Sequence, residues 1–410
     1  MKRKSKILKN LIIWIFICEF LCINGVNIFI LNGKAETNSV LKYDVGDWVH
    51  SIDISSDGQY FVAGSADEFV YLFNRSNITP FWTFNTQGDV YSVSITSDGK
   101  YFTSGSNNGR IYLFDRSNST PLWYYFGAES AEISSDGSKI VATGLYNYDV
   151  YYFNNTSNIP LWNYTLGDFP TSKALSFNGK NFVVGGESVD KTVYYFQKDN
   201  PTPIWSYETG SAIKSVAISS DGKYIAAVSM DLNVYFFENT SNTPLWVYNN
   251  GKPFQDVSIS SDGEYVAVRG WGDKKVYLLN KSSPNPVLTY TTEGFISDIS
   301  LSADGGLLLV GTYDDKVYLF NTMSSKTLWI YPIKNGMGPL VMSSNGDYIA
   351  VGVGNQVYLI PRTYRPSPSY RPPPSYIFIG IIIIVSIGIS ASVVFLYMLN
   401  YIVDKRLKSN

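Results

Sequence analysis

The sequence predicts an all-β protein built from eight copies of one four-stranded unit. Residues 92–126 show the unit, with four short β-branched or aromatic runs bounded by Ser, Asp, Asn or Gly. A turn of the form Asp-Gly or Asn-Gly marks each copy and recurs at intervals of 38 to 43 residues: Asp57, Asp98, Asp136, Asn178, Asp221, Asp262, Asp304 and Asn345. A period near 40 residues with four strands per unit is typical of a β-propeller. We therefore expect an eight-bladed β-propeller over residues 40–361.

The chain begins with the layout of a secretory signal. Five cationic residues between Lys2 and Lys9 precede an apolar stretch over 11–31, and Gly33 and Ala35 provide the small residues of a cleavage site. The stretch is long for a signal, so residues 1–35 are expected to be either a cleaved signal peptide or an uncleaved signal anchor.

The next residues should close the ring. Residues 41–46 align with the fourth strand of the other units, whereas the eighth unit ends at Ile360 without such a strand. We expect Leu41–Asp44 to pair with Val357–Ile360 and complete the eighth blade, which would leave no open sheet edge.

Within each unit the first turn and the third strand repeat most clearly. The turn reads Ser-x-Asp-Gly in most copies, where Asp bonds its own backbone and Gly supplies a positive φ. The third strand reads VYLF at 70–73, IYLF at 111–114 and VYFF at 234–237. Strands buried on both faces need not alternate apolar with polar residues.

The repeated unit resembles the WD repeat, although Phe-Asn or Phe-Asp stands where Trp-Asp would. It is also similar to the repeat of quinoprotein-like propellers, because a Trp-bearing strand follows the third strand. Those tryptophans are Trp82, Trp123, Trp162, Trp205, Trp246 and Trp329, with Leu41 and Leu288 in the other two slots. Both resemblances imply a propeller, and a fold of this kind hosts many functions.

The quinoprotein resemblance implies an alternative function, a quinone-dependent dehydrogenase or a hydrolytic propeller enzyme. Against it, the two cysteines, Cys18 and Cys22, both lie in the N-terminal apolar stretch, and His50 is the only histidine. No insertion carries calcium ligands, and the tryptophans are expected to pack one blade against the next. We expect no catalytic residue, no metal site and no cofactor.

The C-terminal part predicts a membrane anchor. Residues 362–376 are rich in proline and should form an extended stalk. Residues 377–403 contain no charge over 27 positions, enough for a transmembrane helix, and the basic tail 404–410 favours a cytoplasmic C-terminus. The expected location is therefore the cell membrane, single-pass, with the propeller extracellular.

Strand alternation assigns the loops to two faces. The turn face carries the turns between strands one and two and the loops between strands three and four. The loops between strands three and four hold most of the candidate glycosylation sites, with Asn163 in a nearby fourth strand: Asn74, Asn77, Asn118, Asn154, Asn155, Asn163, Asn239 and Asn280. The stalk should leave from this face.

The opposite face, here called the link face, carries the links between blades and the loops between strands two and three. It should point away from the membrane, and its large aromatic residues are the candidate ligand-binding set: Trp48, Tyr146, Phe169, Phe254, Trp271, Phe295 and Tyr313. Aromatic residues beside carboxylates suit a protein or glycan partner. The net charge of −2, more negative in the repeat body because both ends carry cations, argues against nucleic acid. The expected function is a non-catalytic binding or scaffold module.

Overall fold

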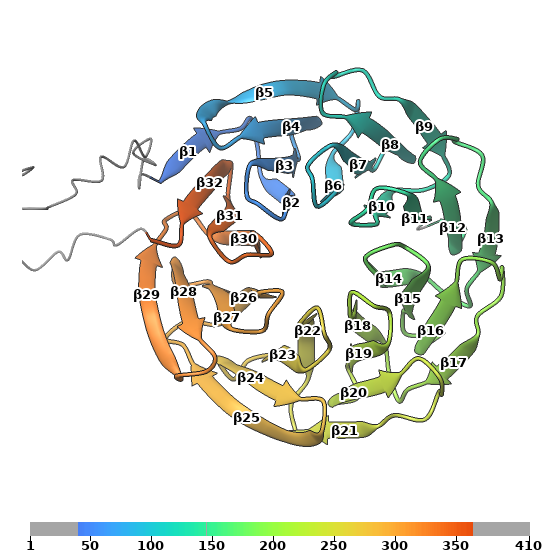
Figure 1. Cartoon of the computed structure of the whole chain (residues 1–410), viewed down its shortest axis with the longest axis vertical. Coiled ribbons are helices and arrows are strands. Elements are labelled where there is room, and N and C mark those ends of the chain that lie inside the picture. Colours follow the sequence, from blue (N-terminus) through green and yellow to red (C-terminus); the bar gives the residue numbers. More distant parts are fainter. Residues whose placement is uncertain (1–39, 145, 364–410) are drawn as a thin grey trace, which may run out of the picture. The chain divides into compact units, whose positions relative to one another are not determined.

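The computed structural model describes residues 40–144 and 146–363. They form eight four-stranded antiparallel sheets, arranged as blades around one axis (Figure 1). In seven blades the strands follow one another in chain order, with the first strand innermost and the fourth outermost. The prediction of an eight-bladed β-propeller is confirmed.

The strands of the first four blades have the following bounds. Blade one holds β2 (Val49–Ile54), β3 (Tyr60–Ser65), β4 (Phe69–Asn74) and β5 (Asn77–Asn85). Blade two holds β6 (Val90–Ile95), β7 (Tyr101–Ser106), β8 (Arg110–Asp115) and β9 (Trp123–Phe126). Blade three holds β10 (Ser130–Ile133), β11 (Lys139–Thr143), β12 (Asp149–Asn154) and β13 (Trp162–Thr165). Blade four holds β14 (Pro170–Leu175), β15 (Asn181–Gly186), β16 (Thr192–Gln197) and β17 (Trp205–Glu208).

The remaining blades repeat the arrangement. Blade five holds β18 (Ile213–Ile218), β19 (Tyr224–Ser229), β20 (Asn233–Glu238) and β21 (Trp246–Asn249). Blade six holds β22 (Phe254–Ile259), β23 (Tyr265–Gly270), β24 (Lys275–Asn280) and β25 (Ser283–Thr291). Blade seven holds β26 (Ile296–Leu301), β27 (Leu307–Thr312), β28 (Lys316–Asn321) and β29 (Lys326–Pro332). Blade eight holds β30 (Met337–Met342), β31 (Tyr348–Val353), β32 (Gln356–Pro361) and, from the other end of the chain, β1 (Leu41–Asp44).

The ring closes as the sequence predicts. β1 pairs with β32 in antiparallel register, from Leu41 opposite Leu359 to Asp44 opposite Gln356. The Tyr43 ring packs edge-on against Phe73 of blade one, 5.5 Å between centroids. One apolar cluster therefore joins blade eight to blade one across the closure.

The first turn of each blade shows why its residues recur. In blade one, the Ser55 hydroxyl donates to Asp57 Oδ1 at 2.8 Å, and the Gln59 amide donates to the same oxygen at 2.9 Å. Gly58 has a φ of 65°, and a Cβ there would lie 2.5 Å from the Tyr348 ring of blade eight. Glycine is required both for the backbone conformation and for the close approach of the neighbouring blade.

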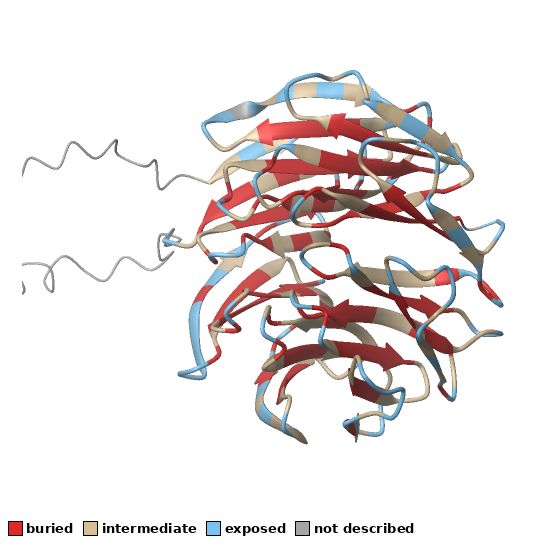
Figure 2. Ribbon diagram, turned by 45° about the vertical axis from the view of Figure 1, so that its right-hand side comes forward, coloured by how far each residue is buried: buried red, intermediate tan, exposed pale blue. Residues whose placement is uncertain are grey.

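The core lies between the blades, because both faces of each sheet are covered (Figure 2). The third strands are buried at four successive positions, as in β4, which explains their lack of alternation. Aromatic pairs stack across the second and third strands, with 4.7 Å between the centroids of Phe61 and Phe73. Several fourth strands instead alternate half-buried with exposed residues, as β9 does at the rim.

The other predicted segments lie outside the described residues. These are the signal or anchor of residues 1–35, most of the stalk at 362–376, the span at 377–403 and the tail at 404–410. In the part of the chain that the structure describes, no helix has the length and apolar character needed to cross a membrane.

Candidate functional site

The link face is held together by backbone hydrogen bonds between the two kinds of segment predicted to share it. In six blades the first residue after the second strand donates its amide to the last residue of the preceding link. Thus Ala66 donates to Trp48, Trp271 to Pro253, and Tyr313 to Phe295, each at 2.8 Å. Links and loops between strands two and three therefore lie side by side.

Six of the seven predicted aromatic residues are exposed on this face. Their exposed fractions run from 39% to 85%, in the order Phe169, Phe295, Trp48, Trp271, Tyr313 and Tyr146. They come from blades one, three, four, six and seven. The Phe295 ring also contacts a cationic side chain, because Lys274 Nζ lies 5.1 Å from the ring centroid.

Phe254 is the exception, and its prediction as a surface residue is wrong. It is the first residue of β22 and is completely buried, 6.0 Å from the Tyr277 ring centroid. Pro253 occupies the last link position of this blade, so the aromatic residue falls one place later, inside the strand. Position within the link, rather than residue type, decides exposure here.

Carboxylates on the link face come from every blade except the eighth, and three adjacent blades carry them without a lysine or arginine. The links and loops of blades one to three contain five acidic residues and no lysine or arginine: Asp47, Asp67, Glu68, Asp89 and Glu129. The lysines of the other links and loops lie in blades four, six and eight, as Lys191, Lys252, Lys274 and Lys334. The sector formed by blades one to three is therefore acidic, and blade seven, with Glu293, Asp314 and Asp315, is acidic as well.

A groove opens in this acidic sector, at the seam between blades two and three. Its volume is about 340 Å³, and it is lined by Asn107, Asn108, Gly109, Phe126, Gly127, Glu129, Tyr146 and Asn147. The link between these blades, 127–129, has three residues, whereas the other seven have four. The first strand β10 is also two residues shorter than its counterparts. The groove occupies the place where other blades have a longer link.

Polar side chains tie the innermost strands of neighbouring blades together. A serine or an acidic residue on one first strand accepts a hydrogen bond from a backbone amide of the next first strand. The Val93 amide donates to Ser51 Oγ at 3.0 Å, and the Ile95 amide donates to Asp53 Oδ2 at 2.8 Å. The same bond recurs from Ile133 to Ser94, from Leu175 to Glu132, and from Leu340 to Asp298.

Three charged residues of these innermost strands share a hollow near the axis. Asp53, Glu132 and Lys173 line a space of about 340 Å³ together with Ser92, Ser94 and Ser172. Burial raises the pKa of Asp53 to about 6 and that of Glu132 to about 7, and lowers the pKa of Lys173 to about 8. The Lys173 ammonium donates to Ser130 Oγ at 2.5 Å. Because both carboxylates and the ammonium bond neighbouring strands, their first role is structural.

A second charged group lies across the ring, in blades six and seven. Burial raises the pKa of Asp298 well above its ordinary range, and the nearby Asp256 carboxylate raises it further. Arg269 Nε lies 3.9 Å from Asp256 Oδ2, and Ser215 donates to the other oxygen at 2.9 Å. Among residues 40–144 and 146–363, no group of three or more His, Cys, Asp or Glu side chains could hold a metal ion.

His50, the one histidine, lies on β2 with its ring exposed and against Tyr91 of β6, 4.8 Å between centroids. Aromatic contact between neighbouring first strands is a sufficient reason for its position. No acid or nucleophile appears among the described hydrogen-bond partners of this ring.

The tryptophans of the fourth strands join each blade to the next, as the sequence predicts. Each indole Nε1 donates to a backbone carbonyl in the third-to-fourth loop of the following blade, or at the equivalent place after β32. The acceptors of Trp82, Trp123, Trp162, Trp205, Trp246 and Trp329 are Arg116, Asn155, Lys198, Asn239, Lys281 and Arg362, at 2.8–3.2 Å.

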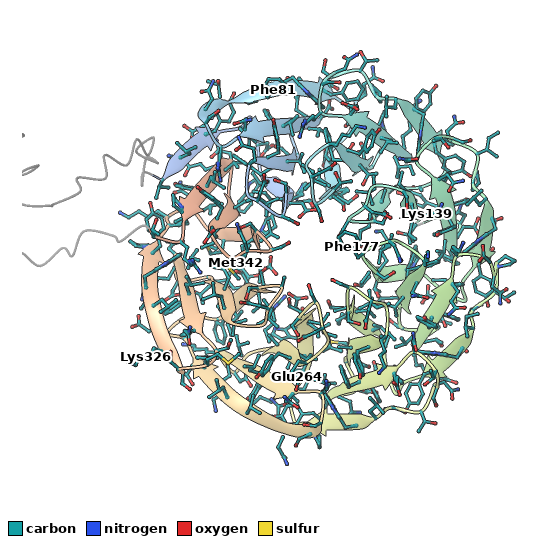
Figure 3. The ribbon with its side chains drawn as sticks, in the orientation of Figure 1. Phe81, Lys139, Phe177, Glu264, Lys326 and Met342 are labelled. Carbon is teal, nitrogen blue, oxygen red and sulfur yellow. The ribbon has the colours of Figure 1, made fainter. Side chains whose placement is uncertain are left out.

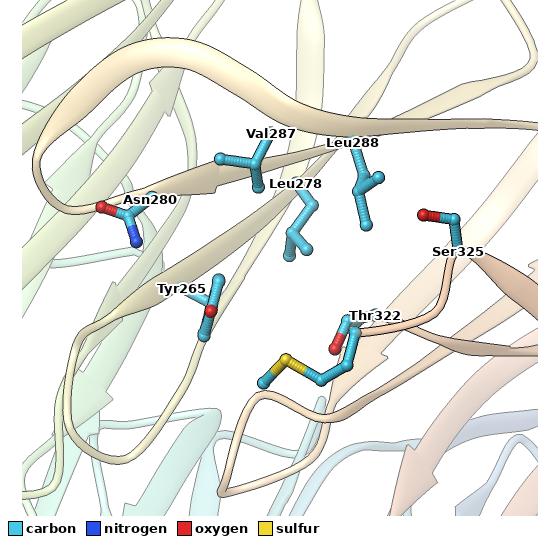
Figure 4. Close-up of a pocket in the computed structure, with 8 residues that line it drawn as sticks. Tyr265, Leu278, Asn280, Val287, Leu288, Thr322 and Ser325 are labelled. Carbon is cyan, nitrogen blue, oxygen red and sulfur yellow. The ribbon is translucent and has the colours of Figure 1, made fainter.

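Leu288 occupies the tryptophan slot of blade six and leaves space at the rim. A pocket of about 270 Å³ lies beside it, lined also by Tyr265, Leu278, Val287 and Met323 (Figure 4). Tyr290, two residues further along β25, replaces the missing bond by donating its hydroxyl to the Asn321 carbonyl at 3.2 Å. The smaller side chain thus explains the pocket.

The predicted glycosylation residues lie mostly in turns on the turn face, as expected. Asn77, Asn118 and Asn163 are exposed, and Asn74, Asn154, Asn155, Asn239 and Asn280 are half-buried. Some of these asparagine side chains stabilise the turn itself; for example, Asn74 Oδ1 accepts a hydrogen bond from the Ser76 backbone amide at 2.9 Å. Use of these sites as glycan acceptors stays a prediction.

Two features of the site were missed by reasoning from the sequence. The short link was visible as the one interval of 38 residues, between Asp98 and Asp136, where the others are 41 to 43. The charged first strands were visible as Asp53 and Glu132 at positions where other units have serine, alanine or valine. Both signals are departures from the repeat.

Comparison with known proteins supports one of the two resemblances. Four stretches match the family model described as WD domain, G-beta repeat: residues 39–74, 78–115, 201–238 and 284–321. Each match begins in or beside the fourth strand of one blade and ends with the third strand of the next. No curated protein matches the chain. The four repeat matches and the eight four-stranded blades together support a WD-repeat propeller.

Proposed function

We propose that this chain is a membrane-anchored, extracellular and non-catalytic propeller that binds a partner protein on its link face. The observation that carries the proposal is the set of six exposed aromatic residues on that face. Large rigid side chains contribute much of the binding energy at protein interfaces, because they bury a large area at a small cost in entropy. WD-repeat propellers typically serve as protein-interaction scaffolds, which agrees with this reading.

The orientation of the described body supports the proposed anchoring. β1 begins at Leu41 opposite Leu359, close to the end of β32, so the chain enters and leaves the propeller on the turn face. A stalk and span following residue 361 would then place the turn face towards the membrane. The link face would be free to meet a partner in solution or on another cell.

The binding proposal is tested by comparing aromatic residues on two surfaces. Cross-linking of the full-length chain on intact cells identifies the partner. Trp48→Ala and Trp271→Ala should each weaken its binding at least tenfold without changing the melting temperature. Phe81→Ala is the matched control, because Phe81 is exposed on the outer rim rather than on the link face (Figure 3). If both tryptophan variants bound the partner as tightly as the wild-type protein does, the proposal would be contradicted.

The topology is tested separately. Protease added to intact cells that carry the chain with a C-terminal tag should degrade the propeller and leave the tag protected. Survival of the propeller in sealed cells, with digestion only after lysis, would rule out an extracellular location.

A further inference from the structure

The groove between blades two and three is the place where the molecule departs from its own repeat. In blade two, Thr86 is followed by Gln87, Gly88 and Asp89 before Val90 of β6. In blade three, Gly127 is followed directly by Ala128. The Asn108 amide donates to the Thr86 carbonyl, and the Asn147 amide donates to the Gly127 carbonyl at 3.3 Å, so Thr86 and Gly127 are equivalent positions. Blade three therefore lacks three residues here, one from the link and two from the start of its first strand.

The missing residues leave two aromatic side chains uncovered. Phe126, the last residue of β9, is 69% exposed, and Tyr146, in the loop between β11 and β12, is 85% exposed. Glu129 is almost fully buried and lines the same groove. The volume, about 340 Å³, falls in the usual range of ligand pockets, roughly 300–1,000 Å³.

The chemistry of the groove favours a cation. Aromatic ring faces attract ammonium and guanidinium groups, and a carboxylate adds charge attraction. The Phe126 ring already accepts one such contact, since the Arg110 guanidinium lies 6.0 Å from its centroid. The surrounding sector adds the carboxylates of Asp47, Asp89 and Glu68 with no lysine or arginine in its links and loops. Such a sector would draw a basic partner towards the groove.

We propose that this groove receives an arginine or lysine side chain from a basic segment of the partner protein. The side chain would lie between the Phe126 and Tyr146 rings, with its charged end towards Glu129. The inference rests on the proposed function and names the chemistry of the partner and the place where it is recognised. The polar side chains Asn108 and Asn147 serve to fix the groove, because their amides already bond the links.

The proposal is tested with a short fluorescent peptide in which arginine alternates with glycine and serine. A peptide with glutamate in place of arginine and a neutral oligosaccharide serve as competing probes. Full-length protein in detergent micelles should bind only the basic peptide, and Phe126→Ala should weaken that binding roughly five- to tenfold. Phe81→Ala is the matched control, because Phe81 is a phenylalanine of similar exposure on the outer rim and does not line the groove.

The most direct variant restores the missing residues. Inserting Gln-Gly-Asp between Gly127 and Ala128 gives blade three the link of blade two, and should abolish peptide binding while leaving the melting temperature unchanged. Arg110→Ala removes a competing cation from the Phe126 ring, so it should strengthen binding of a basic peptide. Weaker binding by Arg110→Ala, or preference for the acidic peptide or the oligosaccharide, would overturn the proposal.

The outcome is separable from that of the proposed function. If the insertion variant still binds the basic peptide like the wild-type protein, the groove assignment is wrong. If partner binding nevertheless depends on Trp48 and Trp271, the link face remains the interaction surface and only the groove is excluded. If no variant on the link face affects the partner, both proposals fail.

Discussion

Asp53 shows how one side chain in an innermost strand can bond both its own strand and the neighbouring blade. Its carboxylate accepts amides from its own strand, at Ile54, and from the next blade, at Ile95, both at 2.8 Å. Ser94 and Ser300 make the bond between blades with a neutral hydroxyl. A carboxylate in this place makes two bonds, but it must be withdrawn from water, which disfavours its charged form.

The pH dependence of stability follows from that burial. The pKa of Asp53 rises from 3.8 to about 6 in the folded protein. Because the folded pKa lies above the unfolded one, protonation stabilises the fold at low pH, and this contribution is lost as the pH rises through about 6. Asp53→Asn should therefore remove a decline in unfolding free energy of about 2–3 kcal/mol between pH 4 and 6.

Unfolding by denaturant at several pH values measures the effect. Asp199→Asn, at an exposed carboxylate, is the control and should keep the wild-type pH profile. Burial raises the pKa of Glu132 to about 7, so this carboxyl group should leave a smaller decline above pH 6 in the Asp53 variant. An unchanged slope in Asp53→Asn below pH 6 would show that this carboxylate is better solvated than its position indicates.

At the scale of the element, the blade is held to its neighbour by a tryptophan on its outermost strand. The indole ring fills the seam, and its N–H bonds a carbonyl of the following blade. Trp246 is one of the two buried members of the set and stacks on Phe236 with 4.8 Å between centroids. It also donates to the Lys281 carbonyl at 3.0 Å.

Trp246→Ala should therefore destabilise the protein by roughly 3–5 kcal/mol, since it removes a buried ring and leaves a carbonyl without its partner. Trp271→Ala is the matched control: the same substitution at a ring that is 55% exposed should change the unfolding free energy by less than about 0.5 kcal/mol. Thermal unfolding of both variants checks the difference. If both variants lost a similar amount of unfolding free energy, the fourth-strand tryptophans would have no special role in packing the blades.

The repeat made the elements predictable, and the departures from it were harder to interpret. Turn residues and third strands recur eight times, so an ambiguous copy can be interpreted from the others. The closure by β1 follows because the last unit lacks a fourth strand and the chain begins with an additional one. Phe254 was misplaced because a one-residue shift between link and strand moves a side chain from surface to core. The groove beside Tyr146 arises where residues of the repeat are missing, and no residue type in the sequence indicates such a deletion.

At the scale of the whole molecule, the ring is stable only if its two ends meet. Seven blades are made of strands that follow one another in the chain, and the eighth takes its outermost strand from residues more than 300 positions away. Beyond the strand pairing, the Val45 amide donates to the Asn355 carbonyl and the Val49 amide to the Gly354 carbonyl, both at 2.8 Å. The closure thus fixes the first and last blades through one shared set of contacts.

Deleting residues 36–46 tests the consequence. The deletion removes β1, leaves β32 with an unpaired edge and uncovers Tyr71 and Phe73, against which Tyr43 packs. Because the blades of a propeller have no independent cores, the loss should be felt by the whole ring and lower the unfolding free energy by roughly 3 kcal/mol or more. The exposed edge should also promote association between chains. Denaturant unfolding and light scattering measure the two effects, and the double change Leu41→Ser with Tyr43→Ser keeps the backbone pairing as a control. This control should lose part of the stability without association. If the deletion variant melted like the complete chain and stayed monomeric, closure by the two ends would contribute nothing to the stability of the ring.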